Sequence, residues 1–537
     1  MEQHIELIVF GLLVAVSGLA VVARLVRIPY PILLVLGGLA FGFIPGVPEV
    51  RLEPDLVLLL FLPPLLYAAA FFANLRELRS NARPIGMLAI GLVIATMLTV
   101  AVVGHEVVGL SWPVAFVLGA VVSPTDAVAP AEILRRLSVP RRVVSVVEGE
   151  NLTNDWTALV AYKFAVAAVA TGSFSLLEAG PEFVYTGLAG VAVGVAAGAG
   201  IAAVRRRVED PITEITISLL TAYAAYLPAE AIGASGVLAA VSAGVWLGWR
   251  ASELTNHTTR LQLTAIWQLL VFLLNAVLFV LVGLQFPTVL DQLSGRTAGE
   301  LAGYGSLIAV VVIVVRIAWV YVLTYLIRRF SSKVRERVPV ANWDQTALVA
   351  WAGMRGSVSL AAALAIPTTI DSGGAFPDRD LVIFLAFCVI LATLVVQGLL
   401  MPALIRALQV EPDTLDQDEE LNARLEIAYA AIDQINDLEE EDWVHPQTVE
   451  RTRGMFEYRR RRFASRVGNG SPDDTDGEDD FDYEGRAQSY QRFMHEVIGA
   501  QRTTLRRLRD EGHVSDEVRR RVEYDLDLEE ARISQAT

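Results

Sequence analysis

The stretch GAVVSPTDAVAPAE, Gly119 to Glu132, places prolines, a threonine and an aspartate inside an otherwise apolar segment. In isolation, Ser-Pro-Thr-Asp is typical of a surface turn. The sequence on both sides stays apolar, however, over a distance that does not fit a surface loop. The wider sequence must therefore decide whether Pro124 and Asp126 lie in water or at membrane depth.

The chain has 537 residues, of which 54% are hydrophobic and only 19% charged. This composition favours a polytopic membrane protein over a soluble enzyme. A spanning helix needs roughly 20 mostly apolar residues, and this criterion predicts an all-α membrane protein with about 13 transmembrane helices. The predicted segments are residues 5–23, 29–46, 55–73, 84–104, 111–133, 143–171, 183–204, 211–228, 232–249, 262–286, 302–327, 343–368 and 380–408.

Positive charge alternates between the loops that join these segments. Lys and Arg in short loops stay on the cytoplasmic side and thereby set the orientation of the chain. One set of loops carries only Arg51, Arg296 and Arg379, and the alternation predicts an extracellular N-terminus and a cytoplasmic C-terminus in the plasma membrane. The opposite set carries Arg24, Arg27, Arg76, Arg79, Arg83, Arg135, Arg136, Arg141, Arg142, Arg205, Arg206, Arg207, Arg250, Arg260, Arg328, Arg329, Lys333, Arg335 and Arg337.

The opening stretch thus falls inside the fifth predicted helix. Proline removes a backbone hydrogen bond, and the carbonyl groups that it frees cannot be satisfied by lipid. A broken helix at this depth is tolerated only where it is buried in protein or lines a wet cavity. The freed carbonyls and the Thr125 hydroxyl predict an oxygen-rich site for a hard cation such as sodium, with Asp126 beside it.

The sixth segment contains EGENLTNDW, Glu148 to Trp156, which places acidic and amide side chains in an apolar helix. At 3.6 residues per turn, Asn151 and Asp155 share one face, and Glu150 and Asn154 share another about 100° away. One polar stripe can face the broken fifth helix, and the other faces a different neighbour. A charge at membrane depth is costly, so these groups are candidates for function.

The twelfth segment contains WAGMRGSVSLAAALAIP, residues 351–367, with Arg355 between Gly353 and Gly356. Paired glycines at this depth predict a second break or a close helix crossing. Segments four to six and eleven to thirteen then share a pattern with the interrupted helix in the middle. This pattern predicts two inverted repeats with a substrate site at the bilayer midplane.

Arg316 lies alone in the apolar eleventh segment and requires an anion, for which Glu150 is the remaining candidate. We predict that the two form a structural ion pair. We expect Glu148 to lie at the cytoplasmic interface close to Arg135. Lys163 either extends to the outer interface, which we favour, or stands in the ion path.

Composition changes after about residue 409, which predicts a transmembrane domain over 1–408 and a cytoplasmic helical tail over 409–537. Residues 467–485 are almost devoid of apolar side chains and predict a disordered linker. A tail helix is predicted from apolar residues with helical spacing: Leu421, Leu425, Ala428, Ile432 and Ile435. Cys388 is the single cysteine, which excludes disulfides within the chain. No motif points to a cofactor, to nucleic acid or to an enzyme's catalytic group.

The membrane segments together resemble the sodium/proton exchanger branch of the monovalent cation:proton antiporter superfamily. The matching motifs are SPTDAVAP at 123–130, EGENLTND at 148–155 and MRGSVSLA at 354–361, together with Arg316. The resemblance covers about residues 1–408, and the tail is similar to those of bacterial members.

The resemblance implies a role for each matching residue. Asp155 would bind either cation or proton, with Thr125 and the backbone of the broken helix completing the coordination and Asp126 close by. Asn154 matches an asparagine that is replaced by aspartate in electrogenic relatives, which implies electroneutral exchange. Asn151 departs from the family, which often has serine there, although an amide oxygen can still coordinate sodium. Arg355 and Arg316 match structural arginines.

The resemblance also implies a homodimer with a mobile core. Helices at about 5–73 and 183–286 would form the dimerisation domain, and helices at about 84–171 and 302–408 would form the core. We expect sodium/proton exchange for pH and sodium homeostasis, with lithium or potassium as further candidate ions. A potassium/proton antiporter of the same fold is the first alternative, and an ion channel or membrane sensor is the second.

Overall fold

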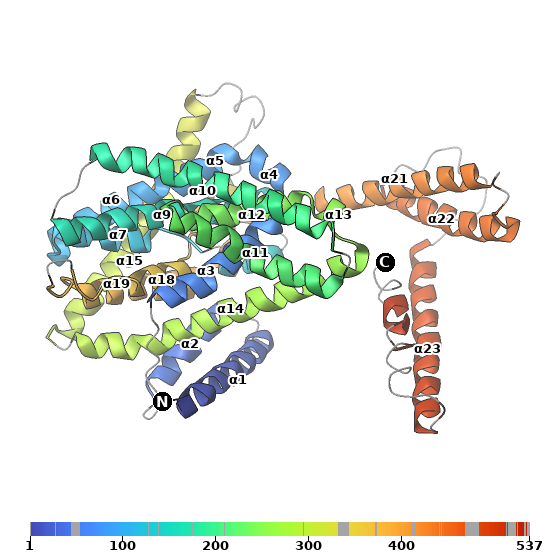
Figure 1. Cartoon of the computed structure of the whole chain (residues 1–537), viewed down its shortest axis with the longest axis horizontal. Coiled ribbons are helices and arrows are strands. Elements are labelled where there is room, and N and C mark those ends of the chain that lie inside the picture. The colour runs from blue at the N-terminus through green and yellow to red at the C-terminus, as the bar shows by residue number, and fades with distance from the viewer. Residues whose placement is uncertain are drawn as a thin grey trace. The chain divides into compact units, whose positions relative to one another are not determined.

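The apolar segments fold into helices in a computed structural model of the chain (Figure 1). The structure describes residues 2–26, 28–44, 54–126, 128–137, 139–172, 176–208, 210–293, 295–330, 343–370, 373–410, 415–439, 443–467, 483–511 and 525–530, and the single positions or pairs 441, 513, 522–523 and 533. Within these residues the chain divides into two compact units, Met1–Asp413 and Thr414–Thr537.

Every segment that hydropathy predicts overlaps a helix of the first unit. Its helices are α1 Glu2–Val26, α2 Tyr30–Gly42, α3 Pro54–Phe71, α4 Leu75–Ser80, α5 Ala82–Gly86, α6 Val93–Val103, α7 Trp112–Val122, α8 Val128–Arg136, α9 Arg141–Thr171, α10 Leu176–Arg205, α11 Pro211–Ala231, α12 Gly236–Trp249, α13 Ala251–Leu254, α14 His257–Gln292, α15 Ala298–Phe330, α17 Trp343–Trp351, α18 Ser357–Leu364, α19 Arg379–Leu391 and α20 Gly398–Ala407. Short π-helical stretches, η1 Met87–Leu92, η2 Gly104–Val108 and η3 Ala392–Gln397, adjoin α5, α6 and α19.

Several helical stretches of the described residues are long and apolar enough to cross a membrane. They are Ala82–Val108, Gly180–Arg205, Thr258–Asp291, Ala298–Tyr325 and Arg379–Ala407. Shorter apolar helices, among them Trp112–Val122 and Gly236–Trp249, accompany them. The number of membrane crossings stays a prediction.

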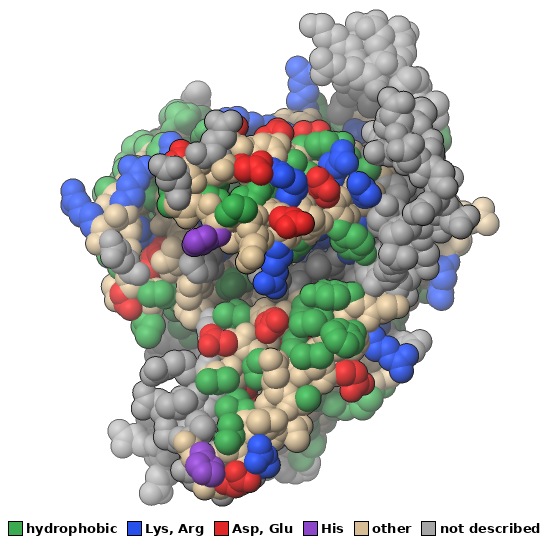
Figure 2. All heavy atoms as spheres, turned by 90° about the vertical axis from the view of Figure 1, so that its right-hand side faces the viewer, with side chains coloured by type: hydrophobic (Ala, Val, Ile, Leu, Met, Phe, Trp, Pro, Cys, Tyr) green, Lys and Arg blue, Asp and Glu red, His purple; other side chains and the backbone are tan. Residues whose placement is uncertain are grey.

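Large apolar side chains are exposed on the outer helices, as expected for surfaces that face lipid. Leu188 on α10 is 69% exposed, and Val310 and Val314 on α15 are 56% and 54% exposed. On the face turned to the viewer in Figure 2, acidic and basic side chains are interspersed with apolar ones.

Both predicted interruptions are breaks in helices. α7 ends at Val122 and α8 begins at Val128, with Pro124 in the non-helical residues between them. α17 ends at Trp351 and α18 begins at Ser357, so the Gly353–Gly356 segment is likewise non-helical. Pro124 cannot donate a backbone hydrogen bond and glycine weakens a helix, which explains why the chain opens at these positions.

The two breaks lie against each other and exchange hydrogen bonds. The Asp126 N–H donates to the Met354 carbonyl at 2.8 Å, and Arg355 Nε donates to the Val122 carbonyl at 3.1 Å. A side chain at Gly356 would collide with the Asp126 carboxylate, so this approach requires glycine. The breaks are therefore buried in protein and partly satisfy each other's backbone groups.

Two packing regions surround the breaks. In one, α7 packs on α6 and α9, and α19 packs on α15. In the other, α14 packs on α2, and α12 packs on α3 and α10. Helix α9 runs between them, with Leu152 buried beside Leu62 and Val241.

The second unit contains α21 Leu415–Leu438, α22 Pro446–Val467 and α23 Tyr483–Asp510. α21 packs against α22, with Leu425 and Ala428 buried and Arg453 paired with Glu439 at 2.5 Å. Residues 468–482 of the predicted linker lie outside the described residues. Both ends of the predicted linker are helical, because Val467 belongs to α22 and residues 483–485 belong to α23.

Candidate functional site

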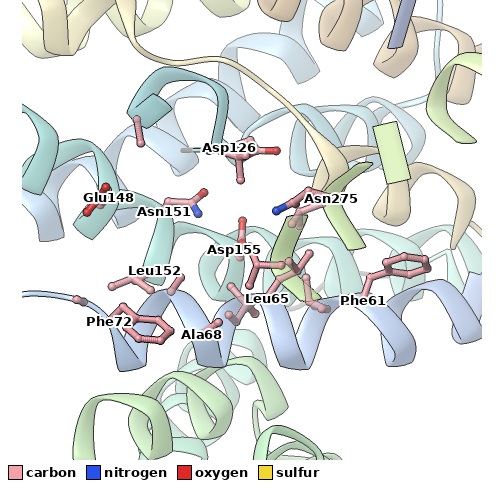
Figure 3. A pocket seen from close by; sticks show the side chains of 18 of the residues that line it. Phe61, Leu65, Ala68, Phe72, Asp126, Glu148, Asn151, Leu152, Asp155 and Asn275 are labelled. Atoms are coloured by element: carbon pink, nitrogen blue, oxygen red, sulfur yellow. The ribbon is translucent and has the colours of Figure 1, made fainter. Parts of the chain in front are cut away.

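A cavity of about 280 Å³ lies among α3, α8, α9, α14 and α18. Apolar side chains of α3, including Leu65, and Phe72 just beyond its end form one wall (Figure 3). Polar side chains gather opposite them: Asp155 and Asn151 come from α9, and Asp126 comes from the break before α8. The structure thus brings three of the predicted cation residues to one cavity.

Asp155 is fully buried on α9, and neither carboxylate oxygen has a hydrogen-bond partner among the described residues. Burial of an ionised carboxylate is unfavourable by several kcal/mol unless a cation, a proton or a set of donors compensates it. Asn151 lies one helical turn earlier on the same face and lines the same cavity. Asp155 is therefore a carboxylate suited to hold either a cation or a proton.

Asp126 lines the cavity and also shapes the backbone at the break. Its Oδ1 accepts a hydrogen bond from the Val128 N–H at 2.8 Å, at the first residue of α8. A carboxylate at a helix N-terminus satisfies a free N–H and is stabilised by the helix dipole. Asp126 therefore both faces the cavity and fixes the start of α8.

Glu150 and Asn154 form the second stripe of α9 and contact Thr125. The Thr125 hydroxyl donates to Glu150 Oε1 at 3.0 Å. Asn154 Nδ2 in turn donates to Thr125 Oγ1 at 2.8 Å and to the Thr125 carbonyl at 3.2 Å. Thr125 thus contacts the Glu150 and Asn154 stripe, while Asp155 faces the cavity.

Glu150 and Arg316 lie side by side, and both are buried. Arg316 Nη1 and Nη2 donate to the two carboxylate oxygens of Glu150 at 2.6 and 2.9 Å, and Nη2 also donates to the Val349 carbonyl at 2.9 Å. A bidentate guanidinium–carboxylate pair is strong and geometrically specific. The pair joins α9 to α15 and, through Val349, to α17.

Arg355 is fully buried in the second break. Besides the bond to Val122, its backbone N–H donates to Thr393 Oγ1 at 2.9 Å, and its Nη1 donates to the Gly353 carbonyl. The side chain therefore satisfies carbonyl groups that both breaks leave without helical partners.

Two further charged residues of α9, Glu148 and Lys163, form ion pairs with neighbouring helices. Glu148 forms an ion pair with Arg135 at 2.5 Å and lines the cavity, so the expected proximity of these two residues is present. Lys163 pairs with Glu230 of α11 at 3.0 Å and is 62% exposed, and the sequence did not predict this partner. Lys163 therefore lies at an exposed position.

The sequence did not predict Asn275 of α14 as a cavity residue. Asn275 on α14 is buried and lines the cavity, and its amide faces the space between Asn151 and Asp155 in Figure 3. It is the lone amide in the run LLVFLLNAVLFVLV, residues 269–282. That isolation was the available signal, but an uncharged amide in an apolar helix is a far weaker indication of function than a charge.

A family model for the transmembrane part of sodium/hydrogen exchangers matches residues 11–407, which include both breaks and the whole cavity. The chain belongs to the sodium/hydrogen exchanger family. This is a family of transporters and not an enzyme class, so the chain is an integral membrane protein and an antiporter.

Exchangers from several bacteria are similar over long stretches. An uncharacterized Na(+)/H(+) exchanger of Mycobacterium tuberculosis is 36% identical over 536 residues, covering 98% of this chain and 97% of the relative. A sodium, potassium, lithium and rubidium/H(+) antiporter of Bacillus subtilis is 34% identical over 415 residues, covering 75% of this chain and 62% of the relative. The Na(+)/H(+) antiporter ApNhaP of Aphanothece halophytica is 33% identical, covering 76% of this chain and 75% of the relative.

The fold also matches a solved structure of this exchanger type. The sodium proton antiporter MjNhaP1 from Methanocaldococcus jannaschii superimposes with a TM-score of 0.61 at 19% identity, covering 76% of this chain and 100% of that chain. The resemblance inferred from the motifs is thereby confirmed at the level of the family, and the likeness in structure supports the fold.

Proposed function

We propose that this exchanger moves sodium and protons in opposite directions through competition at Asp155. The carboxylate must lose its proton to accept a cation, and a bound cation favours the ionised form. The observation that carries this proposal is that Asp155 is buried in the cavity wall with neither oxygen hydrogen-bonded among the described residues. The opposing ion gradient drives the cycle, and an empty charged site is costly to move through the membrane.

Asn151 and Asp126 are the proposed further ligands, because both line the cavity with Asp155. Carboxylate and amide oxygens suit a hard cation such as sodium. For Thr125 we propose a supporting role, since its hydroxyl donates a hydrogen bond to Glu150 and accepts one from Asn154. Direct coordination by Thr125 would require that network to rearrange.

We propose electroneutral exchange of one cation for one proton. Glu150 is neutralised by Arg316, and Asn154 is an uncharged amide. Asp155 is then the carboxylate that alternates between a proton and a cation, while Asp126 stays bonded at the start of α8. The prediction is that the exchange rate does not change when a potassium ionophore clamps the membrane potential.

The proposed movement is that of a core, residues about 84–171 and 302–408, against helices at about 5–73 and 183–286, within a homodimer. The cavity lies between α9 and α18 of this core and α3 and α14 of the other part, which supports an opening at that boundary. The hydrogen bonds between the two breaks favour movement of α7, α8, α17 and α18 together. Inverted repeats, an extracellular N-terminus and a plasma-membrane location belong to the same proposal.

Potassium/proton exchange is the second candidate, because Bacillus relatives are named for sodium, potassium, lithium and rubidium. The test is fluorescence dequenching of a pH dye in proteoliposomes, with sodium, lithium and potassium added in turn. Recovery of the dye fluorescence with sodium and lithium but not with potassium supports the proposal. Recovery with potassium alone supports the second candidate, and cation flux without proton movement would indicate a channel.

A further inference from the structure

Asn275 occupies an unusual position on α14. The neighbouring residues Ala276, Leu278 and Phe279 are buried and apolar, and Asn275 itself is 1% exposed. Neither its amide nitrogen nor its amide oxygen has a hydrogen-bond partner among the described residues. Buried amides in proteins are almost always hydrogen-bonded, so an orphaned one calls for a partner that the protein itself does not provide.

The amide is aimed into the cavity rather than into the helix bundle. The cavity-lining residues of α14 are Trp267, Gln268, Val271, Asn275 and Leu278. Trp267 and Gln268 are adjacent, and the others follow at intervals of three or four residues, so the set shares one helix face. Figure 3 shows the Asn275 side chain directed at the space that Asn151 and Asp155 face from the other side. Gln268 is exposed and lies two turns earlier on the same face.

Asn275 and Asp155 both line the cavity with polar atoms that have no hydrogen-bond partner among the described residues. Two orphaned carboxylate oxygens and one orphaned amide line a single polar space. Because no hydrogen bond fixes the amide orientation, the side chain can present its oxygen to a cation without breaking another contact. A neutral amide adds a ligand without adding a charge, so it leaves the balance of charge between Asp155 and one cation unchanged.

We infer that Asn275 is a cation ligand on α14, which supplies an amide oxygen opposite Asp155 and sets the affinity and ion preference of the site. This inference rests on the proposed function, because it takes Asp155 as the cation-binding carboxylate. It adds a helix outside the proposed mobile core to the coordination of the ion. A cation in this cavity then contacts both parts of the molecule at once.

The first test compares Asn275→Leu with wild type in proteoliposomes. Leucine has the same branching of side-chain heavy atoms but no polar atom, so we expect the sodium concentration for half-maximal exchange to rise about tenfold, which corresponds to about 1.4 kcal/mol. The maximal rate should change by less than about twofold, because Asp155 is untouched. Asn275→Gln keeps the amide but shifts it by one methylene, and we expect an altered ratio of lithium to sodium affinity.

Gln285→Leu is the matched control. Gln285 is also an amide on α14 whose Oε1 has no partner among the described residues, but it does not line the cavity. We expect this variant to keep the sodium affinity of wild type. An equal loss of affinity in both variants would show that any amide removed from α14 has this effect, and would overturn the inference.

The second readout does not depend on transport. Sodium should raise the melting temperature of the purified wild type relative to choline, and the sodium midpoint of this rise should shift about tenfold in Asn275→Leu. If wild type binds sodium in this assay but exchanges nothing, the proposed function fails while the midpoint still decides the role of Asn275. A folded Asn275→Leu with the wild-type midpoint and wild-type ion preference would overturn the inference, as would a wild type without any sodium effect. Should Asn275→Leu not fold, Asn275→Ser takes its place with the same two outcomes.

Discussion

Glu150 and Asp155 lie on the same helix, yet their surroundings differ sharply. The Glu150 carboxylate accepts hydrogen bonds from the Arg316 guanidinium and from the Thr125 hydroxyl, whereas the Asp155 carboxylate has no hydrogen-bond partner among the described residues. In the sequence, only helical phase separated the two carboxylates, and the isolated Arg316 required one of them as its anion. The sequence indicates Asn275 only weakly, because the orientation of an uncharged amide in an apolar helix depends on packing.

Replacement of Glu150 tests the ion pair. Glu150→Gln leaves the Arg316 charge buried without its anion, so we expect a loss of about 3–5 kcal/mol of stability. Thermal melting in detergent measures this loss, with Glu148→Gln as the control at the partly exposed Arg135 pair. If Glu150→Gln melts like wild type yet does not exchange ions, the two stripes of α9 have been assigned wrongly.

At the scale of elements, the two broken helices position the site. Pro124 and the glycines beside Arg355 were sufficient to predict both breaks from the sequence, because such residues at membrane depth interrupt a regular helix. The contacts between the breaks were not predictable. Which carbonyl receives Arg355 Nε depends on how α7 and α17 approach each other, and the observed acceptor is Val122.

The close approach of the breaks predicts a strong effect of a single methyl group. The added Cβ in Gly356→Ala would collide with the Asp126 carboxylate, and Asp126 would leave its place at the start of α8. We expect the exchange rate to fall at least about tenfold, which is about 1.4 kcal/mol of transition-state stabilisation. Gly86→Ala is the control, since nothing lies within 4 Å of its added Cβ. Wild-type exchange by Gly356→Ala would show that the position of Asp126 is unimportant.

Replacement of Lys163 tests the contact between α9 and α11. Its pair with Glu230 joins α9 to α11, and the lysine is 62% exposed. Exposed ion pairs contribute about 0–1 kcal/mol, so Lys163→Ala should melt within a few degrees of wild type and retain exchange. Measured exchange in proteoliposomes decides between the two interpretations of this lysine. Loss of exchange without loss of stability would place Lys163 in the ion path.

At the scale of the whole molecule, the charge of the loops and the hydropathy of the segments were sufficient to predict a helical membrane protein with a charged tail. The lengths of the helices follow from local sequence, and each predicted segment overlaps a helix. The cavity could not be predicted, because its walls combine the consecutive helices α8 and α9 with α3, α14 and α18, which are far from them in the chain. The described residues that line it all belong to the first unit.

The proposed mechanism depends on Asp155 as the carboxylate that exchanges a proton for a cation. Asparagine at this position has nearly the same shape but cannot lose a proton, so the competition that couples the two fluxes disappears. The most direct measurement is sodium-driven proton movement in proteoliposomes containing Asp155→Asn, with insertion and folding verified by thermal melting. We predict a folded protein without exchange. Robust sodium-driven proton movement in this variant would contradict the mechanism.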